Sequence, residues 1–298
     1  MSVFAVSTIK NSSDMSSTVV DQVEWVSVNG AQLFSRRFGN QGPALFVMNG
    51  GPGFSHDYLL ALKALGTNCR VIFFDPRGCG QSTGIIDDST MNMQTFIEDF
   101  DAVRKAHKIE KFTVVGHSSG GLMAMYCTIQ NRHLVERMIL LNSMDAKYVH
   151  APQPKQDYIA GIRAIKASSG FHEGRMDEIV QSYKNFFRDA FYYPHNLEKL
   201  DLGLSSLRAA KNSILVREAF ERTLFEPSFD YQDQLRELHI PTLIIHAAND
   251  FIPRTVAENL QHVLTGSELV DIPNCGHFSV TEHPDLVNSS ISSFMMKK

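Results

Sequence analysis

A Gly-x-Ser-x-Gly motif, Gly116-His117-Ser118-Ser119-Gly120, separates two apolar segments of different periodicity. Residues 111–115 hold Phe, Thr and two Val and predict a buried strand, whereas the apolar side chains after residue 121 recur at helical spacing. Because glycine tolerates the backbone angles of a sharp turn, the motif predicts a strand-turn-helix corner with the Ser118 hydroxyl exposed at its tip. Such a corner presents a serine as a nucleophile, and the alternative is an ordinary turn serine.

Buried strands and amphipathic helices alternate on both sides of this corner. Largely apolar runs predict buried strands at residues 43–48, 70–74, 137–142 and 240–246, and a further strand is expected at residues 268–272. Apolar residues at helical spacing predict helices at residues 56–65, 91–107, 254–264 and 284–296. A β-hairpin that turns at Asn29-Gly30 is expected at residues 23–38. Strands joined by single helices imply an α/β fold with right-handed crossovers and a mostly parallel, eight-stranded sheet flanked by helices.

Residues 147–232 interrupt this alternation after the sixth strand. They predict several helices and, up to residue 231, hold 13 of the 29 aromatic residues, a density that favours either helix packing or a lid over a pocket. We therefore predict a helical cap at residues 147–232, inserted into an α/β core that comprises residues 21–146 and 233–298. The Ser-rich residues 1–20 are expected to form a flexible N-terminal arm.

Composition and charge argue against several classes of protein. The 298 residues are 43% apolar and 20% charged, as in ordinary globular proteins. The net charge of −4 comes from scattered side chains and predicts neither nucleic-acid binding nor a polybasic membrane signal. The sequence also predicts no membrane span and no secretory signal. Its four cysteines lack metal-type spacing and are expected to be free thiols in the cytoplasm.

Three residues suited to nucleophilic catalysis follow predicted strands, in the chain order Ser118, Asp250 and His277. Since the carboxyl ends of parallel strands lie on one edge of a sheet, these side chains are expected to converge there. An imidazole can accept the proton of the attacking serine, and a carboxylate fixes the imidazole tautomer. Asp250 has the alternative role of a helix cap. Other candidates for the acid and the base are Asp145, Asp271, His117 and His283.

An acyl-transfer site also needs N–H donors for the oxyanion of the intermediate. The backbone N–H of Ser119 is one candidate. The second is Gly51, in the loop Asn49-Gly50-Gly51-Pro52-Gly53 that follows the third predicted strand. Gly50 would let a substrate approach the backbone closely and is a candidate substrate-binding position. The alternative for this loop is a plain tight turn.

Several segments together resemble an α/β-hydrolase of the proline iminopeptidase group. They are residues 49–53, the loop Asp75-Pro76-Arg77-Gly78-Cys79-Gly80-Gln81-Ser82, the motif at residues 116–120, Asp250 and His277. The resemblance covers residues 23 to 297 and implies an α/β-hydrolase core, a helical cap and no cofactor. Asn49 stands where the family usually has His, and Ser119 where it usually has Trp.

The same resemblance implies that cap glutamates bind the free amino group of the substrate. One family glutamate lies in a Glu-Asn-His-Tyr-Phe-like segment, which Glu221-Arg222-Thr223-Leu224-Phe225 resembles at its first and last positions. Glu221 is therefore a candidate substrate-binding residue, and the alternative is a side chain on a solvated helix face.

These features predict a serine hydrolase that acts through an acyl-enzyme, in its most specific form an aminopeptidase that releases an N-terminal residue, with proline preferred. The first alternative is an esterase or lactonase of the same fold, and the second is a ligand-binding protein with little turnover. The expected partner is a small-molecule or short-peptide substrate, without metal, nucleic acid or membrane, and the oligomeric state is left open. Cys79 and Cys275 are expected near the pocket, where thiol reagents would block access.

Overall fold

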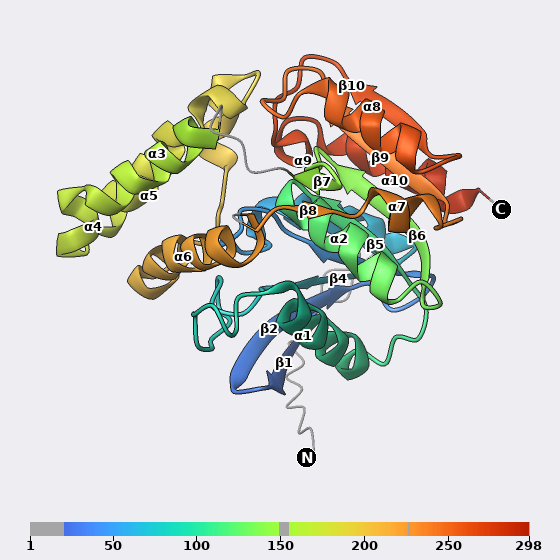
Figure 1. Cartoon of the computed structure of the whole chain (residues 1–298), viewed down its shortest axis with the longest axis horizontal. Helices are drawn as coiled ribbons and strands as arrows, with labels where there is room; N and C mark the ends of the chain where they lie inside the picture. The colour runs from blue at the N-terminus through green and yellow to red at the C-terminus, as the bar shows by residue number, and fades with distance from the viewer. Residues whose placement is uncertain (1–20, 149–154, 226, 298) are drawn as a thin grey trace, which may run out of the picture.

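The eight predicted strands form one sheet in the computed structural model of this protein, which describes residues 21–148, 155–225 and 227–297. The sheet order is β1-β2-β4-β3-β5-β6-β9-β10. The pairings of β1 with β2 and of β2 with β4 are antiparallel, and the other five are parallel. The predicted sheet is thus confirmed (Figure 1). Its strands are β1 (Asp21–Val28), β2 (Ala31–Phe38), β3 (Ala44–Met48), β4 (Arg70–Phe74), β5 (Phe112–His117), β6 (Val135–Leu141), β9 (Thr242–Ala247) and β10 (Glu268–Ile272).

The predicted hairpin opens the described chain. Asn29 and Gly30 have φ angles of 44° and 74°, as a type I′ turn requires, and Val28 pairs with Ala31 on either side of the turn. The predicted N-terminal arm, residues 1–20, lies outside the described residues.

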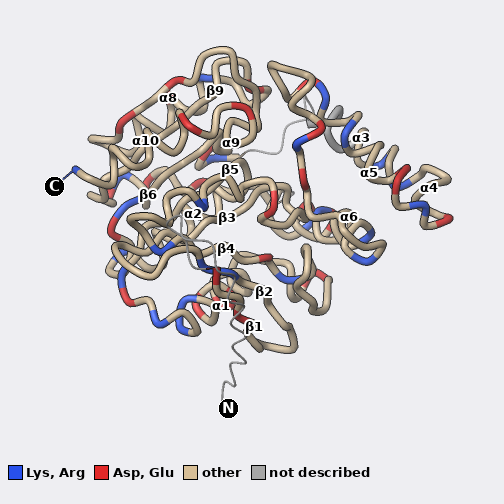
Figure 2. Tube along the Cα trace, turned by 180° about the vertical axis from the view of Figure 1, so that it is seen from behind, with Lys and Arg blue, Asp and Glu red and all other residues tan. Residues whose placement is uncertain are grey.

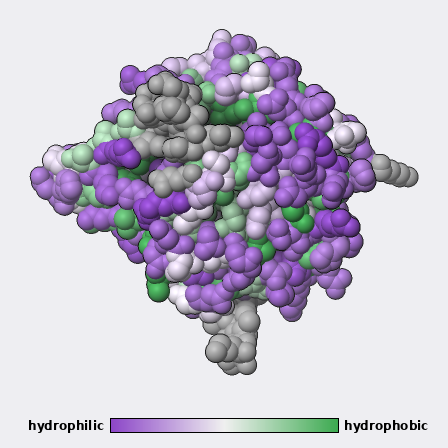
Figure 3. All heavy atoms as spheres, in the orientation of Figure 1, coloured by the Kyte–Doolittle hydropathy of each residue, from purple (hydrophilic) through white to green (hydrophobic). Residues whose placement is uncertain are grey.

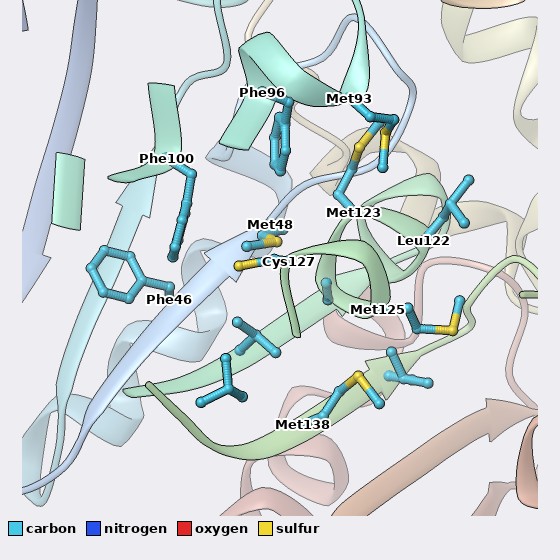
Figure 4. Close-up of a cluster of buried hydrophobic side chains, with 14 of the residues drawn as sticks. Phe46, Met48, Met93, Phe96, Phe100, Leu122, Met123, Met125, Cys127 and Met138 are labelled. Atoms are coloured by element: carbon cyan, nitrogen blue, oxygen red, sulfur yellow. The ribbon is translucent and has the colours of Figure 1, made fainter. Parts of the chain in front are cut away.

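Apolar side chains of the central strands alternate between the two faces of the sheet. Phe46 and Phe74 pack on one face beneath α1 (Met93–Ala106), α2 (Ser119–Gln130) and α8 (Arg254–Val263). Leu45 and Phe73 pack on the other face beneath η1 (Asp57–Thr67) and α10 (Pro284–Met296). Figure 4 shows part of the first cluster, in which Phe46 of β3 lies beside Phe100 of α1. Both faces are covered, which explains the continuous apolar runs of the strands.

The segment after β3 is a 3₁₀-helix, η1, rather than an α-helix. Its buried residues Leu59, Leu62 and Leu65 recur every three positions. That spacing places them on one face of a helix with three residues per turn. The sequence pattern predicted a helix here but not its type.

Most helices between β6 and β9 lie in residues 155–225, within the segment 147–232 that the sequence predicts as the cap. From here on, the word cap refers to residues 155–225. In Figure 1, α3, α4 and α5 extend to the left of the sheet and α6 lies below them. A short antiparallel pair that the sequence analysis missed, β7 (Lys147–Tyr148) and β8 (Phe229–Asp230), joins the two ends of the insertion. The elements of the cap are α3 (Lys155–Ala167), α4 (Ser169–Glu173), α5 (Met176–Phe186), η2 (Arg188–Ala190), η3 (Pro194–Lys199), α6 (Leu207–Phe220) and η4 (Glu221–Phe225, a π-helix).

Several cap aromatics pack between the cap and the core. Phe187 and Phe191 lie against Phe278, with ring centroids 5.3 and 5.0 Å from it, and Tyr183 lies against Phe54. The domain boundaries at residues 146/147 and 232/233 remain predictions from the sequence. Two short helices of the core were also missed, namely α7 (Gln232–Arg236) and α9 (Ser279–Glu282).

The surface carries interspersed charges of both signs. Figure 2 shows acidic and basic residues mixed along the trace, and the face in Figure 3 is largely hydrophilic with hydrophobic residues in separate spots. Within the described residues, no helix is both long and apolar enough to cross a membrane.

Candidate active site

Ser118 occupies a sharp corner between β5 and α2. Its φ and ψ angles are 56° and −123°, a conformation that non-glycine residues rarely adopt and that costs on the order of 1–3 kcal/mol. Glycine at position 116 permits the corner, because a Cβ there would lie 2.3 Å from the main-chain oxygen of Gly120. The backbone is thus held in the strained turn predicted for the motif, and Ser118 remains partly exposed while its neighbours are buried.

His277 and Asp250 form a buried pair at the carboxyl edge of the sheet. His277 Nδ1 lies 2.8 Å from Asp250 Oδ1 and 3.0 Å from Oδ2. Asp250 also accepts bonds from the Ile252 N–H at 2.9 Å and from Asn142 Nδ2 at 2.7 Å. Burial alone would raise the pKa of the Asp250 carboxyl, but His277 and these donors outweigh it and lower the pKa. The carboxylate therefore stays ionised and holds the Nδ1–H tautomer of His277, which leaves Nε2 to accept a proton.

Asn142 is a site residue that the sequence analysis missed. It follows β6 at a φ of 46°, donates to Asp250 and accepts a bond of 2.6 Å from Ser279 Oγ. The sequence signal that could have identified Asn142 is a polar residue at the carboxyl end of a central strand. Asn142 thus holds the carboxylate of Asp250, and Ser279 holds the amide of Asn142.

The other candidates for the acid and the base are engaged in other hydrogen bonds. Asp145 accepts the N–H of Ala146 and a weak bond of 3.4 Å from Asn259, while Asp271 pairs with Arg254 at the surface. His283 bonds the main-chain oxygen of Asn274. His117 points into the core, with Nε2 2.9 Å from the main-chain oxygen of His277.

The segments of Ser118 and His277 lie side by side. The rings of His117 and His277 have centroids 4.7 Å apart, so the residue before Ser118 contacts the residue predicted as the base. Among the hydrogen bonds of the described residues there is none between Ser118 Oγ and His277. In structures without substrate this bond is often long and tightens in the substrate complex.

The loop after β3 lies against Ser118. A Cβ at Gly50 would lie 2.8 Å from Ser118 Cβ, so only glycine fits there. The Gly50 N–H donates to the Tyr58 hydroxyl at 2.6 Å, which engages it away from a substrate oxygen. Arg217 of the cap donates to the main-chain oxygens of Gly51 and Pro52. Gly51 and Ser119, the latter at the first turn of α2, remain the predicted oxyanion donors.

A pocket opens beside this loop and under α6. Its apolar wall includes Phe96 and Met123, which Figure 4 shows at the edge of the core cluster. None of its described lining residues carries a charge. They are Asn49, Gly50, Pro52, Gly53, Pro76, Cys79, Phe96, Ser119, Met123, Val216 and Phe220. Because the lining carries no charge, the pocket would bind an uncharged group next to Gly50 and Ser119 more favourably than an ionic group.

Glu221 lies half-buried in η4 and is not among the described lining residues of that pocket. Its role in binding an amino group remains a prediction.

Glu282 ties the cap to the loop that carries His277. Its carboxylate accepts the N–H groups of Gly276 at 2.6 Å, Tyr193 at 2.8 Å and Tyr192 at 3.2 Å. The His277 N–H donates to the cap's Ala190 oxygen at 2.7 Å. This edge of the cap is therefore anchored to the loop that carries His277.

Cys79 lines the pocket and Cys275 lies two residues before His277, but both thiols are buried. Burial raises the pKa of Cys275 to about 12 and also raises the pKa of Cys79, with nearby carboxylates adding to each shift. We expect iodoacetamide at pH 7 to modify the folded protein very slowly, because the thiolate is the reactive form. Mass spectrometry of protein labelled before and after unfolding measures the extent of modification. Fast labelling of the folded protein with loss of activity would instead support the expectation that thiol reagents block access to the pocket.

Comparison with known proteins supports the fold. The chain is similar to a proline iminopeptidase of Thermoplasma volcanium, with 24% identity over 92% of this chain and 96% of that protein. It is similar to a putative carbamate hydrolase of Agrobacterium fabrum, with 24% identity over 86% of this chain and 94% of that protein. A solved enol-lactonase from Burkholderia xenovorans superposes with a TM-score of 0.72 at 18% identity, covering 92% of this chain and all (100%) of that one.

These relatives carry names that refer to different substrates, and their identities are low. A family model described as the alpha/beta hydrolase fold matches residues 43–284, which is well over half of the chain. Together with the sheet order and the inserted cap, this match shows that the chain belongs to the α/β-hydrolase family.

Proposed function

We propose that this protein is a serine hydrolase that forms an acyl-enzyme on Ser118. The observation that carries the proposal is the pairing of a serine at a strained elbow with a buried Asp250–His277 pair beside it. Ser118 Oγ attacks the substrate carbonyl while His277 Nε2 takes its proton, and Asp250 stabilises the imidazolium. The Gly51 and Ser119 N–H groups bind the oxyanion. His277 then protonates the leaving group, and water, activated by the same imidazole, hydrolyses the acyl-enzyme.

An aminopeptidase that releases an N-terminal residue, proline preferred, is our more specific proposal. The named proline iminopeptidase relative supports it, at 24% identity. An esterase or lactonase is the second candidate, favoured by the uncharged lining of the pocket beside Gly50 and Ser119. Such a lining offers no counter-charge to a substrate ammonium group. A cytoplasmic location also remains a prediction from the sequence.

A panel of three substrates separates these activities. It comprises an unblocked prolyl arylamide, its N-acetylated twin and a short-chain nitrophenyl ester, with Ser118→Ala as the blank. Fast cleavage of only the unblocked amide supports the aminopeptidase, and cleavage of the ester alone supports the second candidate. If Ser118→Ala retains the wild-type rate on every substrate that is cleaved, the serine mechanism is wrong. A folded protein that cleaves none of them would favour the ligand-binding alternative.

Replacing Glu221 with glutamine tests the finer proposal. If Glu221 binds the substrate ammonium group, KM for the unblocked arylamide should rise about tenfold, because a charge-assisted bond is lost. KM for the nitrophenyl ester should stay unchanged. Glu218→Gln is a suitable control, since Glu218 pairs with Lys166 within the cap. An unchanged KM for the unblocked substrate would remove Glu221 from the binding site.

A further inference from the structure

A chain of hydrogen bonds runs through two buried side chains that the proposed mechanism does not use. The Gly50 N–H lies 2.6 Å from Tyr58 Oη, Tyr58 Oη lies 3.0 Å from His117 Nδ1, and His117 Nε2 lies 2.9 Å from the main-chain oxygen of His277. The chain links three separate segments: the loop after β3, the elbow at the end of β5 and the loop after β10. Each segment carries one part of the proposed catalytic site.

The direction of every bond in this chain follows from chemistry. A carbonyl oxygen can only accept, so His117 Nε2 carries a hydrogen and donates to the oxygen of His277. In a neutral imidazole Nδ1 is then the acceptor, and the Tyr58 hydroxyl donates to it. The Gly50 amide can only donate, and Tyr58 Oη accepts from it. One tautomer of His117 thus satisfies all three bonds at once.

Burial keeps His117 in that neutral state. The ring is fully enclosed, and burial, reinforced by the neighbouring His277, lowers its pKa to about 3. Phe278 stacks on His117 with centroids 6.0 Å apart and meets Tyr58 edge-on at 5.7 Å. Both side chains are therefore fixed in orientation, and His117 is also held in its neutral form.

We propose that Tyr58 and His117 are positioning residues, which hold the oxyanion loop, the Ser118 elbow and the His277 loop in their catalytic arrangement. The inference rests on the proposed hydrolase function. Gly50 precedes the predicted oxyanion donor Gly51, and its N–H is held by the Tyr58 hydroxyl. His117 holds the backbone of the general base while Asp250 holds its ring.

Replacing Tyr58 with phenylalanine breaks two of the bonds without changing the ring. We expect kcat on the preferred substrate to fall about 10- to 100-fold, with KM changed less than about twofold, because the donors and the base are misplaced while the pocket is intact. His117→Phe keeps an aromatic ring but has no ring nitrogen, so it loses both the donor to the His277 oxygen and the acceptor for Tyr58. It should therefore lose a similar factor, and the Tyr58→Phe/His117→Phe double variant should lose no more than the worse single variant. If the kcat losses of the two single variants multiplied in the double variant, the hydrogen-bond chain would not act as a unit.

Tyr183→Phe is the matched control. Tyr183 is equally buried and its hydroxyl lies 2.7 Å from Ser213 Oγ in the cap. Its loss should lower Tm as Tyr58→Phe does, yet leave kcat unchanged. An equal fall of kcat in both variants, or a rise of KM in Tyr58→Phe at unchanged kcat, would overturn the positioning role.

A second measurement does not depend on turnover. In ¹⁵N NMR spectra of the wild type, His117 should remain the neutral Nε2–H tautomer from pH 8 to pH 5, and the Gly50 amide should exchange slowly. In Tyr58→Phe that amide should exchange faster. Titration of His117 in this range or unchanged Gly50 exchange would contradict the chain. If the wild type shows no Ser118-dependent hydrolysis, the proposed function fails, and these NMR results still decide whether the hydrogen-bond chain exists.

Discussion

Replacing Asp250 with asparagine is expected to lower kcat about 10⁴-fold while the protein stays folded. The Asp250 carboxylate accepts bonds from His277, Ile252 and Asn142. Asparagine would present its NH2 group to at least one of these donors. His277 would then adopt the wrong tautomer, or the network would lose a hydrogen bond. The substrate that the panel identifies, assayed at pH 7–8, gives kcat, and circular dichroism reports folding.

Asp145→Asn is the control for this prediction. Asp145 also follows a central strand but bonds Ala146 and Asn259 rather than His277. Its replacement should change kcat less than about twofold. If Asp250→Asn kept kcat within tenfold of the wild type, Asp250 would be a structural residue instead of the acid of the site.

Replacing Arg77 with methionine is expected to lower the free energy of unfolding by about 3–5 kcal/mol. Arg77 makes a two-pronged pair with Asp99, at 2.9 and 2.7 Å, and both side chains are only 4% exposed. The guanidinium also donates to the main-chain oxygen of Asn29 at 3.0 Å, which ties the hairpin to the loop after β4. Removing the guanidinium would leave the Asp99 carboxylate buried without its counter-charge. Burial already raises the pKa of Asp99 while Arg77 is present.

Urea unfolding measures this loss, and two further variants interpret it. Arg77→Met/Asp99→Leu should recover part of the stability, because no buried charge remains. Arg175→Met removes exposed pairs with Glu173 and Glu178 and should change stability by less than about 1 kcal/mol. A loss in Arg77→Met no larger than in Arg175→Met would show that the buried pair contributes little.

Local periodicity was sufficient to predict the frame of this fold. The buried strand β4 has an apolar run whose limits match the structure, and the predicted limits of the edge strand β10 match as well. The turn at Asn29-Gly30 carries its own conformational signal. The type of η1 was not predicted, because a spacing of three or four residues fits either kind of helix over a short stretch. The pair β7–β8 was also missed, since strands of two residues have no period.

The candidate site was only partly predictable for a different reason. Residues with obvious chemistry after a strand, such as Asp250 and His277, can be found from the sequence. The supporting groups Asn142, Tyr58 and Glu282 depend on partners that the local sequence does not show. Asn142 bonds Asp250, 108 residues away, and Tyr58 bonds His117, 59 residues away. Glu282 acts through backbone N–H groups of other segments. Their roles depend on tertiary packing, which no local pattern contains. His117 was noted as a histidine near the nucleophile, but its tautomer follows only from its neighbours in space.

Covalent labelling with a fluorophosphonate tests the central claim most directly. Intact-mass and peptide analysis of the folded wild type at pH 7.5 should show one adduct per chain, on Ser118. The adduct should be absent in Ser118→Ala and in the unfolded wild type, and it should form far more slowly in His277→Gln, because the activated hydroxyl requires its base. Labelling of another residue, or equal labelling of Ser118 with and without His277, would contradict a serine nucleophile activated by that histidine.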